Sequence, residues 1–181
     1  KHLLEYDNVM NEQRRIIYKI RRDILNDEGN NELINDFVEE VAFHLVEQVK
    51  PEKKVTLREY PWDEININLK AVFNVDKPLN ADSCSKETQG DIYEYFKKAG
   101  IETLVNKFKG FEPEQVKYTY REVLLATFDQ FWKDHLLAMD HLKEGINLRS
   151  YGQKDPLVEY KREAFVLYEN MKDAIKRAVI E

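Results

Sequence analysis

Three long stretches of the sequence repeat apolar residues at alternating spacings of three and four, and this pattern narrows the possible folds more than any other feature. The stretches cover residues 3–25, 124–142 and 157–178. Such spacing places the side chains in one stripe along an α-helix, as in helices that pack in coiled coils and bundles. The sequence therefore predicts an all-α protein built on long helices. The first stripe comprises Leu3, Tyr6, Met10, Gln13, Ile17, Ile20 and Ile24.

The composition is that of a globular protein and argues against several other classes. Charged residues make up 34% and hydrophobic residues 43% of the 181 residues, and the formal net charge is −6. A net negative chain is a poor candidate for a dedicated nucleic-acid binder. Cys84 is the only cysteine, so we expect no disulfide within the chain and a reducing compartment. No apolar run approaches the ~20 residues of a membrane span.

Shorter and more broken segments separate the first long stripe from the other two. Residues 31–50 read as a helix that Pro51 ends. Residues 61–73 read as a short helix with Pro61 at its first position. Residues 74–90 are polar and read as a loop, and a helical pattern returns at 91–109.

The last part of the chain predicts a pair of consecutive long helices. The helical pattern runs from about residue 114 to residue 143. Asp155 followed by Pro156 marks a second start, because aspartate caps a helix and proline presets φ at its first position. We expect Phe128, Trp132 and Met139 in the seam that stiffens this hairpin.

These patterns predict three divisions of the chain. Residues 1–26 and 116–181 would form a bundle of long helices, and residues 27–115 would form a smaller helical insertion. The chain begins at Lys1, and the apolar pattern of the first long helix is present from Leu3 and Leu4 onward. Such a start is expected of a fragment of a longer protein.

The segment between the two long helices departs from ordinary turn chemistry. It carries Leu148 and Tyr151, with Lys143, Arg149 and Lys154 making it locally basic. One interpretation is that the apolar side chains fold back as a staple on the hairpin. The other is that the tip of a rigid hairpin contacts another molecule, for which a tyrosine is well suited.

The first helix presents four arginines, for which two interpretations are open. They could form intrahelical pairs with Glu12 and Asp23, or they could contact a partner. The arginines are Arg14, Arg15, Arg21 and Arg22.

Residue patterns of enzymes are weak or missing in the sequence. It contains no glycine-rich phosphate loop and no H-E-x-x-H motif. His135 and His141 are six positions apart, which puts them on different sides of a helix. We expect such histidines to be solvated or hydrogen-bonded at the surface. No nucleophile, base and oxyanion site assemble, so these residues predict no catalytic site and no bound metal or cofactor.

Two stretches resemble the helical scaffold region of the SecA family of bacterial preprotein-translocase motor ATPases. They are "LLEYDNVMNEQRRIIYKIRRDIL" and "FDQFWKDHLLAMDHLKEGINLRSYGQKDPLVEYKREAFVLYENM". The resemblance covers residues 1–26 and 116–181. Residues 27–115 are similar to the helical wing of the family in length and position.

The resemblance implies an architecture and a role. A long scaffold helix, an inserted wing and a two-helix finger are expected, with the finger entering the cytoplasmic mouth of the SecY channel. Tyr151 matches the aromatic tip residue that contacts the translocating polypeptide, with Leu148, Arg149 and Lys154 beside it. The family's finger also regulates its ATPase. ATP and Mg²⁺ would be bound by motor domains elsewhere in the full protein, which lies in the bacterial cytoplasm and peripherally at the inner membrane.

Two other classes remain open. One is a stand-alone helical adaptor that binds a partner helix along its exposed faces. The other is a hydrolase or metal enzyme with a site spread over the wing region.

Overall fold

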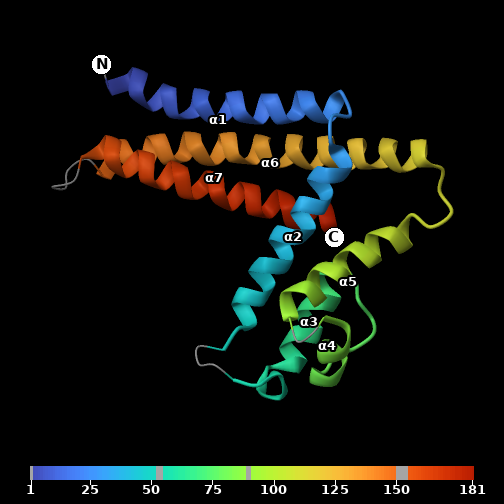
Figure 1. Ribbon diagram of the computed structural model, residues 1–181. Helices are drawn as coiled ribbons and strands as arrows, with labels where there is room; N and C mark the ends of the chain where they lie inside the picture. Colours follow the sequence, from blue (N-terminus) through green and yellow to red (C-terminus); the bar gives the residue numbers. More distant parts are fainter. Residues whose placement is uncertain (1, 52–54, 89–90, 150–154) are drawn as a thin grey trace. The chain divides into compact units, whose positions relative to one another are not determined.

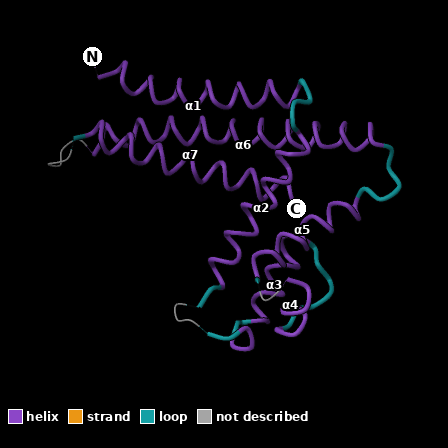
Figure 2. The backbone as a smooth tube through the Cα atoms, in the orientation of Figure 1, coloured by secondary structure: helices purple, strands orange, loops and turns teal. Residues whose placement is uncertain are grey.

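The computed structural model describes residues 2–51, 55–88, 91–149 and 155–181. These residues form helices and loops without a strand (Figure 2), which confirms the all-α prediction. None of the described helices is both long and apolar enough to span a membrane. The helices are α1 (His2–Leu25), α2 (Asn30–Val49), α3 (Trp62–Phe73), α4 (Ala81–Thr88), α5 (Ile92–Lys107), α6 (Pro113–Arg149) and α7 (Pro156–Ile180), with a short 3₁₀ helix at Leu57–Glu59.

The chain divides into two compact units. Unit 1 comprises residues 1–30 and 119–175, and unit 2 comprises residues 31–118 and 176–181. The last six residues therefore group with unit 2, whereas the predicted division placed them with the long hairpin.

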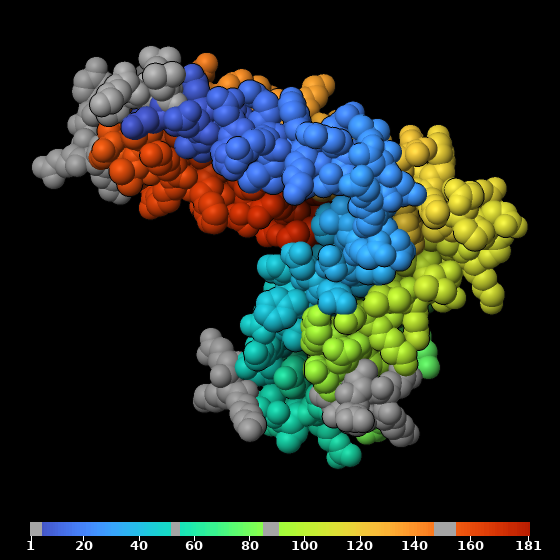
Figure 3. All heavy atoms as spheres, turned by 45° about the horizontal axis from the view of Figure 1, so that its top comes forward, coloured from blue at the N-terminus to red at the C-terminus, as the bar shows by residue number. Residues whose placement is uncertain are grey.

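Unit 1 is a bundle of α1, the main part of α6 and most of α7. Figure 1 shows these helices side by side, with α6 antiparallel to both others, and Figure 3 shows α1 lying along α7. The predicted apolar stripes face one another in its core, because helices with a single apolar face bury it by packing together. The buried residues of this core include Ile17, Ile24, Leu124, Phe128, Trp132, Met139, Leu142, Ile146, Tyr160, Ala164, Tyr168, Met171 and Ile175, of which Ile146 and Tyr160 were not among the predicted stripe residues.

Unit 2 is built around α2, α3 and α5. The close approach of these helices depends on Gly100 in α5, where an added Cβ would lie 2.6 Å from Val38 Cγ1 and 2.9 Å from Phe73 Cε1. Val38 and Phe73 are themselves buried. Since protein interiors are close-packed, a methyl group at position 100 has no free space to occupy. The apolar face of α2 is buried as its pattern predicts, through Ile34, Phe37, Val38, Val41, Leu45 and Val49.

The prediction of a loop over residues 74–90 is wrong in part, because α4 lies within it. Asn80 starts this helix: its Oδ1 accepts a hydrogen bond from the Ser83 backbone N–H at 2.9 Å. Leu79 and Cys84 are buried, at 4% and 1% exposure. Two apolar side chains in a polar run are too few to show a helical period, so α4 could not be recognised from the sequence.

Helix α6 continues six residues beyond its predicted end at Lys143 and passes through Gly145. A glycine inside a helix costs about 1 kcal/mol relative to alanine. The neighbouring Leu142 and Ile146 are buried, at 7% and 2% exposure, and their burial offsets that cost. Gly145 is therefore part of the helix and not its end.

Candidate functional site

The candidate contact site is the segment that joins α6 to α7. Asp155 caps α7, because its Oδ1 accepts a hydrogen bond from the Leu157 backbone N–H at 2.9 Å, directly before Pro156. The backbone of Leu148 and Arg149 forms the last two positions of α6. The side chains of these two residues, and all of Tyr151 and Lys154, lie outside the described residues, so the predicted contact surface stays a prediction.

A compact apolar cluster supports the hairpin close to this segment. Its buried members are Met139, Leu142, Ile146, Tyr160 and Ala164, and Tyr6, Val9, Met10 and Leu167 pack against it. Tyr6 of α1 meets Tyr160 of α7 edge to face, with ring centroids 4.7 Å apart. Ile146 precedes the joining segment by only a few residues and Tyr160 follows it closely. Packing against a third helix therefore stiffens the hairpin almost to its end.

Further along the hairpin, the seam contains a buried polar contact between α1 and α6. His135 and Gln13 are 4% and 7% exposed, so His135 is not the surface histidine that its pattern predicted. Gln13 Nε2 donates to the Ala164 carbonyl at 3.3 Å, and Gln13 Oε1 lies 2.8 Å from His135 Nε2. The amide oxygen can only accept, so His135 Nε2 carries a proton.

Aromatic rings surround His135 in the seam. Its ring centroid lies 5.5 Å from that of Trp132 and 5.9 Å from that of Tyr168. Burial among these groups lowers the pKa of His135, because a low-dielectric environment disfavours the charged imidazolium. His135 is therefore neutral in the folded protein at neutral pH.

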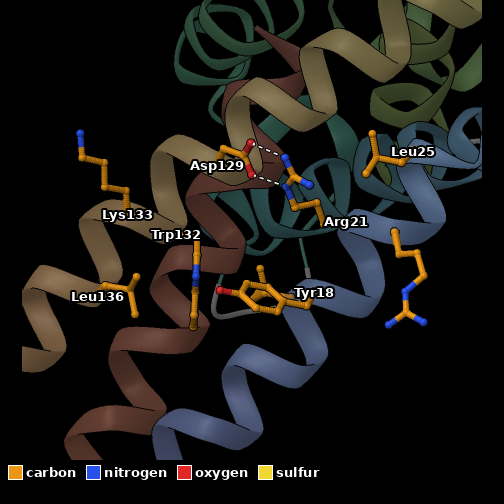
Figure 4. Close-up of a pocket in the computed structure, with 9 residues that line it drawn as sticks. Tyr18, Arg21, Leu25, Asp129, Trp132, Lys133 and Leu136 are labelled. Atoms are coloured by element: carbon orange, nitrogen blue, oxygen red, sulfur yellow. Dashed lines mark hydrogen bonds and ion pairs between the residues drawn. The ribbon is translucent and has the colours of Figure 1, made fainter.

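A groove between α1 and α6 presents mixed apolar and basic side chains (Figure 4). Tyr18 and Leu25 of α1 line it and are about half exposed, and Trp132 of α6 lines it from the other side. Arg21 holds Asp129 across the groove through two hydrogen bonds, at 2.8 and 3.1 Å. The remaining lining residues are Ile17, Arg22, Lys133 and Leu136.

Of the arginines of α1, Arg15 follows the intrahelical interpretation and Arg21 follows neither of the two interpretations that the sequence left open. Arg15 pairs with Glu12 within the helix at 3.0 Å. Arg21 pairs with Asp129 of α6 instead of Asp23, so it joins two helices of unit 1. The intrahelical interpretation therefore holds for Arg15 and is wrong for Arg21.

The histidines and the cysteine that could bind a metal are separated from one another in the described parts of the chain. His135 is engaged by Gln13, His141 is exposed, and Cys84 is buried in unit 2. Among the residues that the structure describes, no three His, Cys, Asp or Glu side chains are placed to hold a metal ion.

Comparison with known proteins gives matches over the whole chain. The family described as SecA Wing and Scaffold domain matches residues 1–181. A protein named protein translocase subunit SecA from Syntrophobacter fumaroxidans is 40% identical over 99% of this chain and 21% of its own length. The protein of the same name from Rickettsia rickettsii is 37% identical over 100% of this chain and 20% of its own length. The chain thus spans about a fifth of these relatives.

Proposed function

The chain belongs to the SecA wing and scaffold domain family, and from this premise we propose that its α6–α7 hairpin acts as the two-helix finger of a SecA-type protein translocase. In this proposal the segment between α6 and α7 contacts the translocating preprotein and the SecY channel. The observation that carries the proposal is the buried cluster at Met139, Ile146 and Tyr160, which stiffens two consecutive long helices almost to their junction. A contact that pushes on a polypeptide requires such stiffness.

The rest of the translocase would supply the energy. The sequence of these residues contains no glycine-rich phosphate loop, and we propose that ATP and Mg²⁺ are bound by motor domains of the same full-length polypeptide. The finger would regulate that ATPase through the scaffold helices. The full protein would act in the bacterial cytoplasm and reach the inner membrane peripherally, through the channel. No nucleic acid takes part.

Substitution of Tyr151 tests the proposal in a complete translocase that contains this region. Tyr151→Ala is expected to impair preprotein movement strongly, and Tyr151→Phe to retain most of it, because the aromatic ring makes the contact. Tyr118→Ala, which removes an exposed tyrosine near the start of α6, is the matched control and is expected to have little effect. Translocation is measured as the protease-protected preprotein in membrane vesicles.

Crosslinking gives a second and independent measurement. A photoreactive residue at position 151 is expected to capture both the channel and a stalled preprotein. Full preprotein movement by Tyr151→Ala, together with no crosslink to either molecule, would exclude the finger role.

A second candidate function is an adaptor that binds a partner helix. It is favoured by apolar side chains that unit 1 leaves exposed, with Leu137 at 59% and Phe165 at 62%. Phe165 lines a groove between α1 and α7 together with Val9 and Ile16. If the adaptor role is correct, Phe165→Ser abolishes binding of the partner and Tyr151→Ala leaves it unchanged.

A further inference from the structure

Three polar contacts join α1 to α6 at intervals along unit 1. Lys143 Nζ lies 3.0 Å from Asp7 Oδ1. Gln13 Oε1 lies 2.8 Å from His135 Nε2, and the Arg21 guanidinium binds the Asp129 carboxylate at 2.8 and 3.1 Å. From Asp7 to Arg21 α1 advances 14 residues, and from Lys143 to Asp129 α6 retreats by the same 14. The three contacts therefore belong to one antiparallel register.

We infer that these contacts select the register of α6 against α1, and that Gln13 and His135 are positioning residues for the hairpin end. The apolar seam does not select a register by itself, because its side chains recur at about every seventh position. A slip of seven residues would again bring apolar residues opposite one another. Polar groups buried at single seam positions are a known means of removing this ambiguity.

The cost of the slipped arrangements follows from the sequence. A shift of α6 by seven residues places Gln13 opposite Leu142 or Phe128 instead of His135. Neither side chain can accept or donate a hydrogen bond, so the buried amide would lose its partner on α6. A buried polar group without its partner is destabilising, because it gives up its hydrogen bonds to water without replacing them. The observed register is the one in which both polar side chains are satisfied by each other.

The three contacts do not contribute equally. The side chains of Lys143 and Asp7 are 37% and 53% exposed, and those of Arg21 and Asp129 are 41% and 50% exposed. Exposed ion pairs contribute little, because water and salt screen them. Gln13 and His135 are nearly fully buried, and Gln13 also binds the Ala164 carbonyl of α7. One amide therefore aligns all three helices of unit 1.

The register matters for the finger if the proposed function is correct. A slip of seven residues moves α6 by about 10 Å along its axis, at 1.5 Å per residue. The last turn of α6 would move with it. The contact between Gln13 and His135 thus sets the position of the end of α6 along α1.

The register can be measured directly by pulsed dipolar spectroscopy between two spin labels. The labels are attached to cysteines introduced at Lys19 of α1 and Leu137 of α6, which are both exposed, in a chain with Cys84→Ala. Leu137 lies about two turns along α6 from the level of Lys19, so axial slippage changes the distance between labels. When all three polar contacts are intact, the labelled chain is expected to give a single narrow distribution of distances between the two labels.

Removal of the polar contacts is expected to keep the fold and lose the single register. The variant combines Gln13→Leu and His135→Leu with Asp7→Ala and Arg21→Ala. An apolar pair in place of a buried hydrogen-bonded pair is near neutral or stabilising, so helicity and the unfolding midpoint should be retained. The distance distribution should broaden or gain a second component. The matched control, Met10→Leu with Met139→Leu, changes two apolar seam residues and should keep one distance.

Two results would overturn the inference. One is a single unchanged distance in the variant that lacks all three contacts. The other is failure of that variant to fold, since the contacts would then be needed for stability and not for the choice of register. The distance measurement involves neither the channel nor a preprotein, so its outcome does not depend on the outcome of the Tyr151 experiment.

Discussion

At the scale of single residues, the burial of His135 makes the free energy of unfolding of unit 1 depend on pH. The burial that lowers its pKa acts only in the folded state. The unfolded chain binds a proton at this imidazole near its ordinary pKa of about 6.5. Below that pH the unfolded state holds more protons than the folded state, so the free energy of unfolding falls as the pH falls.

We therefore expect the urea midpoint of unfolding to decrease between pH 7.5 and pH 5.5, and to decrease less in His135→Gln. Glutamine keeps a hydrogen-bonding side chain at this position without a titratable group. His141→Gln is the control, because His141 is exposed on the same helix. Equal pH dependence in His135→Gln and the unmodified chain would contradict the expectation.

At the scale of elements, the long helices and the short α3 could be predicted, whereas α4 and the last six residues of α6 could not. The stripes of α1 and α2 have several apolar residues each, so their period is visible in the sequence. In α4 the apolar signal is confined to Cys84 and the preceding Leu79, and the predicted end of α6 at Lys143 precedes Gly145, through which the helix continues. In each case tertiary burial decided the structure, and burial is not visible in a local pattern.

The pairing of Gln13 with His135 could not be predicted for a different reason. The two residues are 122 positions apart, so their contact depends on the register between helices. Periodicity identified Gln13 as a seam residue but could not identify what faces it. The contact residues Leu148 and Tyr151 stay predictions that rest on the family resemblance.

The start of α7 offers a test at this scale. Asp155→Ala is expected to lower the free energy of unfolding by about 1 kcal/mol, because it removes the acceptor for the Leu157 N–H. Asp155→Asn should lose much less, since asparagine also caps helices. Asp140→Ala, at an exposed position inside α6, is the control and should be nearly neutral. Chemical denaturation gives all three values, and equal effects of Asp155→Ala and Asp140→Ala would show that the cap is unimportant.

At the scale of the whole molecule, we expect unit 1 to fold by itself, because its core contacts are internal to it. The cluster around Met139 and the contacts of Gln13 and Arg21 all lie within it. We expect a polypeptide of residues 1–30 joined by a flexible Gly/Ser linker to residues 119–175 to be helical by circular dichroism and to melt in one transition. Met139→Asp, which buries a charge, should abolish this folding. A spectrum of random coil for the linked polypeptide would show that unit 1 depends on unit 2.

Gly100 has a consequence for how sequences of this kind can diverge. An added methyl group would overlap Val38 and Phe73, which lie on two other helices. A larger residue at position 100 can therefore be inherited only after one of those two side chains has become smaller. The order of substitutions at positions 38, 73 and 100 is therefore restricted, and which residue each position accepts depends on the other two. Divergence in the wing should then proceed by paired replacements there, while solvent-facing positions change independently.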